Sequence, residues 1–268
     1  MLDFGSTTAT SGDRLNSPYH AESGNTTDTT WNRVLIDANP VTGLSFADGT
    51  AAAGISYVEL KNVGAGSTSV LRGAASGNGY AGNGAMNTGI YAGTSAAGDS
   101  LSWNNVSNSG RGVGIQLYGL AEGTYDIYIS GRDAAITSTY NMNFYAGAVS
   151  KTVTTSNSAS TNVNILGPEF LVGTTTFSGT NNTSSWVYNS GDSSASNYVK
   201  LSVSITSLNP NLTIFALGDN GAAISEGILS SVQIVSAASP VPEPTSFAFL
   251  GGAAGLLFAA GRRRRRLG

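Results

Sequence analysis

The chain has 268 residues, of which 40% are hydrophobic and 11% are charged, and it contains 35 glycines, one histidine and no cysteine. The charged share is less than half of the usual value of about 25%, which excludes disorder driven by high net charge. Glycine, serine, threonine and asparagine are abundant whereas strong helix formers are scarce, and this composition argues against a helical bundle. The lack of cysteine excludes disulfides and thiolate metal sites.

The charge is distributed unevenly along the chain. Five of the 13 basic residues are the consecutive arginines Arg262, Arg263, Arg264, Arg265 and Arg266. Residues 1–240 hold the other 8 basic residues and 15 of the acidic ones, which gives this part a net charge of −7. An acidic body offers no surface for phosphate groups, so we do not expect a nucleic-acid partner.

Short apolar alternations recur along residues 1–238 between clusters of glycine, serine, asparagine and threonine, a pattern typical of strands joined by turns. The region at 74–100 is rich in glycine and asparagine and predicts a long loop, and the polar region at 150–162 is compatible with a strand or a hairpin. The strands we predict cover residues 31–37, 55–61, 101–106, 113–120, 123–131, 139–146, 161–166, 186–189, 198–205, 212–217 and 228–235.

Two of these segments alternate clearly enough to predict which side chains face the core. In 123–131 and 198–205 the inward residues are expected to be Tyr125, Ile127, Ile129, Val199, Leu201, Val203 and Ile205. The outward residues are expected to be Asp126, Tyr128, Ser130, Tyr198, Lys200, Ser202 and Ser204. Because parallel strands need long crossovers, short strands without intervening helices predict an antiparallel, all-β sandwich of two sheets with long Gly/Asn/Ser loops.

The C-terminal stretch 239–268 has three physically different parts. Three prolines at 240, 242 and 244 predict an extended linker over 239–244. Residues 245–260 carry no charge, and as a helix these 16 residues span roughly 24 Å of a hydrocarbon core of about 30 Å. The arginines in the basic end, 261–268, favour the cytoplasmic side, so we predict one transmembrane helix with residues 1–238 outside the cytoplasm.

The order and spacing of these parts resemble the PEP-CTERM sorting tail of Gram-negative bacteria. The residues that carry the resemblance are Val241, Pro242, Glu243 and Pro244, followed by the apolar segment and the terminal arginines. The resemblance implies recognition by an exosortase, an integral-membrane cysteine transpeptidase, and a location in the cell envelope: inner membrane first, then the outer surface or matrix. A plain tail anchor without processing is the alternative. The resemblance covers only about the last 28 residues.

Proteins with this tail are normally exported, yet the first residues contain neither a basic region nor an apolar region of a secretory signal. We therefore expect the true start to lie upstream of Met1, or the signal to have been omitted.

The body is similar to the jelly-roll sandwich of galactose-binding-like domains. The segments that carry this resemblance are Gly123-Thr-Tyr-Asp-Ile-Tyr-Ile, Leu229-Ser-Ser-Val-Gln-Ile-Val, Asp3-Phe-Gly, Asn16-Ser-Pro-Tyr-His20 and Thr30-Trp-Asn32. The resemblance implies an antiparallel jelly-roll-like β-sandwich. Jelly-roll carbohydrate binders also commonly hold a structural calcium ion, for which Asp48, Asp192 and Asp219 are the candidates. Asp before or near Gly is more often an ordinary turn former, and we favour that interpretation.

Few residues suit catalysis. The single histidine, His20, follows Pro18 and Tyr19 in a turn-like stretch, so we expect a structural hydrogen-bonding role, and no Gly-x-Ser-x-Gly elbow is present. Paired carboxylates for glycoside hydrolysis are available in principle but nothing in the sequence brings them together. The candidates are Glu59, Glu122, Asp126 and Asp133.

Sugar binding needs exposed aromatic rings flanked by polar groups. The candidate glycan contacts are Trp31, Trp103, Trp186 and Tyr188. We therefore expect an exported, non-catalytic envelope or matrix protein that contacts glycans or matrix components and has no cofactor beyond the candidate calcium ion. The alternative is a surface polysaccharide-active enzyme, a hydrolase or lyase that uses paired carboxylates.

Overall fold

The structure is a computed structural model, and it divides into two compact units, Met1–Ser236 and Ala237–Gly268. The residues that it describes are 1–4, 15, 17–34, 40–60, 69–72, 89–92, 112–131, 139–153, 167–177, 186–218 and 227–237. Within these ranges no helix has the length and hydropathy that a membrane crossing requires. The predicted linker, transmembrane helix and basic end at 239–268 lie outside them.

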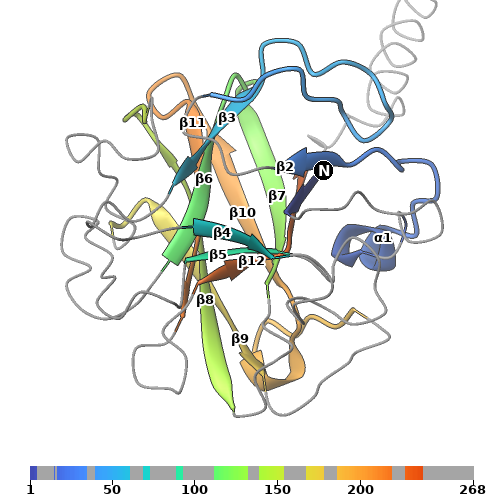
Figure 1. Cartoon of the computed structure of the whole chain (residues 1–268), viewed down its shortest axis with the longest axis vertical. Helices are drawn as coiled ribbons and strands as arrows, with labels where there is room; N and C mark the ends of the chain where they lie inside the picture. Colours follow the sequence, from blue (N-terminus) through green and yellow to red (C-terminus); the bar gives the residue numbers. More distant parts are fainter. Residues whose placement is uncertain are drawn as a thin grey trace, which may run out of the picture. The chain divides into compact units, whose positions relative to one another are not determined.

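The first unit is built from β-strands, which confirms the predicted all-β class (Figure 1). The first sheet has the order β10 (Val199–Ile205), β7 (Gly123–Ser130), β13 (Ser231–Ser236), β1 (Leu2–Phe4), β2 (Asn32–Val34). The second sheet has the order β3 (Ser56–Leu60), β6 (Gly112–Tyr118), β11 (Asn211–Gly218), β8 (Tyr140–Val149), β9 (Phe170–Phe177). A small third sheet has the order β12 (Ile228–Leu229), β5 (Gly89–Ala92), β4 (Ser69–Arg72). All described pairs are antiparallel except β1 with β2.

One hydrophobic core joins the first two sheets. Ile127 and Ile129 of β7 are fully buried in the same cluster as Ile115 of β6, Phe144 of β8 and Ile214 of β11. The inward residues predicted for the segment 198–205 also belong to this cluster, with Val199, Val203 and Ile205 buried and Leu201 packed against it. The alternation of apolar residues therefore identified the inner face of the first sheet correctly.

The side chains on the outer faces of β7 and β10 are less exposed to solvent than the alternation predicts. Tyr198 and Tyr128, both expected to point outward into solvent, are 4% exposed, and Ser130 is fully buried. The cause is a cover over this face: helix α1 (Pro18–Ser23) packs against β7, and Tyr128 and Tyr198 pack on one another. Helix α1 precedes β7 by about 100 residues and Tyr198 follows Tyr128 by 70, so this cover leaves no mark on the period-two pattern of the strands themselves.

One predicted strand is wrong in the structure and another is interrupted. Residues 186–189 form no strand, because the Asn189 side chain and carbonyl accept hydrogen bonds from Gly191 and Asp192 and start a turn. The segment 228–235 is broken at Ser230, where the chain leaves the third sheet and enters the first. At this break Ser230 N donates to the Ser130 carbonyl at 2.8 Å.

Several described elements were missed by the sequence analysis. These are β1, β4, β9, the strand β5 inside the predicted loop 74–100, and α1. Helix α1 has only six residues, begins at an N-cap serine, Ser17, and ends at Gly24 in a left-handed conformation with φ of 65°. Of the other expected strands, 101–106 and 161–166 lie outside the described residues, as does most of 150–162.

Candidate functional site

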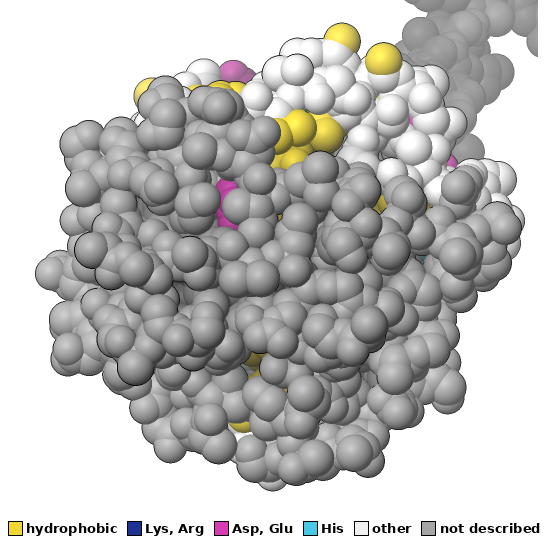
Figure 2. Space-filling view, viewed as in Figure 1, with side chains coloured by type: hydrophobic (Ala, Val, Ile, Leu, Met, Phe, Trp, Pro, Cys, Tyr) yellow, Lys and Arg dark blue, Asp and Glu magenta, His cyan; other side chains and the backbone are white. Residues whose placement is uncertain are grey.

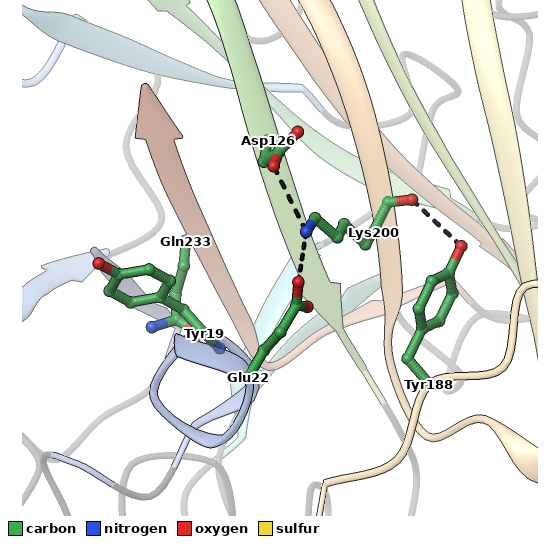
Figure 3. Close-up of polar contacts among 6 residues, drawn as sticks. All are labelled: Tyr19, Glu22, Asp126, Tyr188, Lys200 and Gln233. Atoms are coloured by element: carbon green, nitrogen blue, oxygen red, sulfur yellow. Dashed lines mark hydrogen bonds and ion pairs between the residues drawn. The ribbon is translucent and has the colours of Figure 1, made fainter. Parts of the chain in front are cut away.

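The outer face of the first sheet carries a group of aromatic and charged side chains that we call the tyrosine patch. They come from β7, from β10 and the segment that precedes it, and from α1 (Figure 3). The residues of the tyrosine patch are Tyr19, Glu22, Asp126, Tyr128, Trp186, Tyr188, Tyr198 and Lys200.

Strand register places the centre of the tyrosine patch. Lys200 of β10 lies directly opposite Tyr128 of β7, which in turn lies opposite Gln233 of β13. Side chains at directly paired positions lie on the same face of a sheet. Because the neighbours Ile127 and Ile129 point into the core, this row of three points outward, away from the second sheet.

Helix α1 is fixed above this row by hydrogen bonds to β13. The Oε1 atom of Gln233 accepts from Tyr19 N at 3.0 Å, and its Nε2 atom donates to Ser17 Oγ at 2.8 Å. Gln233 itself is fully buried, so these bonds are shielded from water. This anchoring places Tyr19 5.8 Å from the Tyr128 ring and brings Glu22 to Lys200 (Figure 3).

His20 links the start of α1 to the segment that follows the helix. It is 5% exposed, its Nε2 lies 2.7 Å from the Asp28 carbonyl and its Nδ1 lies 2.5 Å from Ser17 Oγ. A carbonyl can only accept, so Nε2 donates, and in the neutral ring Nδ1 accepts the Ser17 hydroxyl proton. Burial lowers the pKa of His20 below its usual value, outweighing the effect of its hydrogen bond to Asp28. A neutral ring with both nitrogens hydrogen-bonded agrees with the structural role that the sequence predicts for His20.

Lys200 is the charged centre of the tyrosine patch. Its Nζ pairs with the Glu22 carboxylate, lies 3.4 Å from Asp126 Oδ2, and stands 5.1 Å from the centroid of the Tyr128 ring. Partial burial acts to lower the pKa of Lys200, but hydrogen bonds to Glu22 and Tyr128 outweigh it and hold the pKa above its usual range. The ammonium group is therefore protonated at neutral pH and places a positive charge between the Glu22 and Asp126 carboxylates.

The aromatic side chains form a layer beside Lys200. Tyr198 is buried beneath Tyr188, whose ring centroid is 5.4 Å away at 32°, and Trp186 meets Tyr198 edge-on at 6.3 Å. Burial raises the pKa of Tyr198 to about 12, and the negative charge of Glu22 adds to the effect. The outermost ring is Tyr188, which is 37% exposed and whose hydroxyl donates to the Lys200 carbonyl at 3.4 Å (Figure 3).

The segment that carries Trp186 and Tyr188 is tied down although it is irregular. Val187 N donates to Asn197 Oδ1 at 3.0 Å, and Asn197 N donates to the Val187 carbonyl at 3.0 Å. This reciprocal pair of hydrogen bonds holds Trp186 and Tyr188 against the start of β10. An exposed ring with fixed orientation, next to an ion pair, is suited to binding a flat ligand surface such as the C–H face of a sugar.

The four predicted aromatic contacts differ in their exposure and position in the structure. Trp31 is 9% exposed and belongs to the core, which leaves it little surface for a ligand. Trp186 is half-buried and Tyr188 is exposed, and both belong to the tyrosine patch. Trp103 lies outside the described residues.

The carboxylates proposed for catalysis are not brought together as one site. Glu59 is fully buried in β3 of the second sheet, Glu122 is exposed in the turn between β6 and β7, and Asp126 lies on the first sheet. Asp133 lies outside the described residues. Asp126 is instead paired through Lys200 with Glu22, a residue that the sequence analysis did not consider. Lys200 therefore lies between these two carboxylates.

The described calcium candidates act as turn formers. Asp48 Oδ1 accepts from Thr50 N at 2.9 Å and from its hydroxyl at 2.7 Å, and Asp192 does the same with Ser194 at the start of the 3₁₀ helix Ser193–Ala195. These bonds, first of all those from the hydroxyl groups, lower the pKa of both carboxyls. Asp219 lies outside the described residues, and among those described no three acidic, histidine or cysteine side chains form a metal-binding group.

Comparison with known proteins adds no relative to this description: no protein-family model, no curated protein and no solved structure matches the chain.

Proposed function

We propose that this chain is an exported, non-catalytic cell-envelope protein whose β-sandwich contacts glycans through the tyrosine patch. The observation that carries the proposal is the tilted contact between the rings of Tyr188 and Tyr198, with the outer ring exposed and the inner ring buried. A ring supported from below loses little conformational freedom when a sugar packs on it. Lys200, Glu22 and Asp126 lie next to the ring and offer charged hydrogen-bond partners to sugar hydroxyls.

The finer fold that we propose is a jelly-roll-like sandwich. Two five-stranded sheets around one core support it, as does the mixing of early and late strands in the first sheet, where β1 lies between β13 and β2. Such long-range strand order is expected when a chain passes repeatedly between two sheets.

Sorting is the second part of the proposal, and it is supported by the sequence of the tail. Val241-Pro-Glu-Pro244, the uncharged segment 245–260 and the arginines 262–266 are arranged as an exosortase substrate requires. We propose that the segment 245–260 spans the inner membrane with the arginines in the cytoplasm, and that an exosortase then processes the tail near Glu243.

The glycan part is tested by retention of the intact chain on insoluble polysaccharides, with release of reducing sugar measured in parallel. We expect retention without sugar release, and Tyr188→Ala is expected to weaken retention by roughly three- to tenfold. Phe46→Ala is the matched control, because Phe46 is an exposed aromatic residue outside the tyrosine patch. Equal retention of both variants would overturn the assignment of the patch, and sugar release that a carboxylate substitution abolishes would establish an enzyme instead.

The sorting part is tested by the mass of the chain from cells with and without an exosortase. We expect a mass loss at the tail only where the exosortase is present, and we expect Glu243→Gln to reduce it. Glu122→Gln, an exposed carboxylate in the body, is the control and is expected to be processed normally. An unchanged mass in both kinds of cell would reject processing.

A further inference from the structure

A cavity of about 400 Å³ opens at one end of the first unit, between the first two sheets. Its walls come from β1, β13, β6, the turn after β6 and the segment 44–55. Leu44, Leu117, Leu120, Val232 and Ile234 supply apolar surface. Figure 2 shows hydrophobic side chains at the surface of the end where β3 and the segment before it lie.

The side chains of Asn32 and Tyr125 in the wall are already hydrogen-bonded to other residues of the wall. The Nδ2 atom of Asn32 donates to the Ser45 carbonyl at 2.7 Å, and its Oδ1 atom accepts from Ser45 N at 2.8 Å. The Tyr125 hydroxyl donates to the Ala121 carbonyl at 2.9 Å. None of the described residues that line the cavity has a charged side chain. The group in the described wall that titrates near neutral pH is the α-amino group of Met1, whose pKa burial lowers to about 6. Above that pH the amine is mostly neutral, so a charged ligand group would be buried without an oppositely charged partner, which is costly.

The space is built by small residues on fixed turns. Ala47 and Ala52 face it, and larger side chains at these positions would fill it. The segment 44–55 is closed by hydrogen bonds from Ala52 N to the Leu44 carbonyl and from Phe46 N to the Thr50 carbonyl, both at 2.8 Å. A preformed apolar cavity of this size lies within the range of about 300 to 1,000 Å³ that small-molecule sites occupy.

We propose that this cavity binds the aliphatic chain of an uncharged single-chain amphiphile, such as a long-chain alcohol. The apolar walls take up the hydrocarbon. Among the described lining residues no side chain is charged and the Met1 amino group is mostly neutral above about pH 6, which disfavours a carboxylate or ammonium head. The cavity shares no residue with the tyrosine patch, so this binding is independent of glycan contact.

Isothermal titration of the intact chain with hexanol, octanol and decanol in detergent-free buffer tests the proposal. Each added methylene is expected to raise the affinity about fourfold until the chain outgrows the cavity. At about pH 8, where the Met1 amino group is mostly neutral, decanoate is expected to bind at least about tenfold more weakly than decanol, because its charge meets no opposite charge in the described walls. The absence of saturable alcohol binding, or equal binding of decanoate, would overturn the proposal.

Variants that fill the cavity locate the site. Ala47→Leu is expected to weaken decanol binding by at least about tenfold while the thermal unfolding temperature is kept or raised. If Ala47→Leu does not fold, Ala121→Leu, at an exposed part of the lining, replaces it as the cavity-filling variant. The matched control is Ala195→Leu, which lies in the 3₁₀ helix outside the lining. Unchanged affinity in folded Ala47→Leu and Ala121→Leu proteins would show that the alcohol binds elsewhere.

Discussion

Gln233 on the last strand of the body donates from Nε2 to Ser17 Oγ at 2.8 Å, joining residues 216 positions apart. Ser17 is the N-cap of α1, so the bond attaches the start of the helix to the first sheet. The same amide accepts from Tyr19 N through its Oε1 atom. Together with the contact between the Tyr19 and Tyr128 rings, this attachment holds Glu22 beside Lys200 in the tyrosine patch.

Gln233→Leu is expected to lower the free energy of unfolding by about 1–3 kcal/mol, because it leaves Ser17 Oγ and Tyr19 N without the bonds they make to the amide. Urea denaturation of the intact chain measures the change. Ser202→Ala, an exposed position on β10, is the control and should change the free energy by less than about 0.5 kcal/mol. If Gln233→Leu were as stable as the parent chain, the attachment of α1 would not depend on this amide.

The stability of the body is expected to fall as the pH drops through the normal range of histidine. The pKa of His20 in the folded state lies below its usual value of 6.5, so the unfolded chain binds the proton more readily. The contribution of the neutral ring is thus complete above that value and is lost as the pH falls toward the lowered folded pKa. Protonation would also make Nδ1 a donor, so that Ser17 Oγ would accept three bonds with two lone pairs.

His20→Gln separates this effect from other titrations. The stability difference between the parent chain and the variant should be largest near about pH 8 and should shrink toward about pH 5.5. Urea denaturation at each pH measures it. A difference that is constant over this range would contradict the assignment of a neutral, buried His20.

Lys200→Met keeps the length of the side chain but removes the charge that pairs with Glu22 and Asp126. The side chains of Lys200, Glu22 and Asp126 are 26%, 38% and 28% exposed, so water screens the pairs and we expect a loss of only about 1 kcal/mol. The loss should be smaller in about 1 M salt than in about 0.05 M salt. A double-mutant cycle with Glu22→Gln should give a coupling of about 0.5–1 kcal/mol, and zero coupling would show that the pair contributes nothing.

The contrast between the two faces of β10 shows how far sequence reasoning reaches. Val199, Val203 and Ile205 were predicted to face the core because alternation is a local property, and they do. Tyr198 was predicted to face water, but Tyr128 and Trp186 cover it. Burial that comes from another part of the chain cannot be seen in the local pattern.

The tyrosine patch was foreseen only in part for the same reason. Tyr188 and Trp186 were selected as aromatic candidates, whereas Glu22 was not, because its partner Lys200 lies 178 positions away. The local signal for α1 was present in Ser17, Pro18 and Gly24, which are typical of a helix start and stop. Such a short helix without apolar periodicity does not stand out from a turn.

Gly119→Ala is expected to destabilise the body by more than the ordinary cost of a left-handed residue. Gly119 has a φ of 80°, and a Cβ atom built there would lie 2.1 Å from the Gly54 carbonyl oxygen. Gly43 has nearly the same φ, 77°, but its Cβ would meet nothing within 4 Å, so Gly43→Ala measures the backbone cost alone, about 1–2 kcal/mol. The excess for Gly119→Ala in urea denaturation then measures the close approach of two turns at the cavity. Equal losses for the two variants would mean that this wall moves apart easily, and the cavity would then not be preformed.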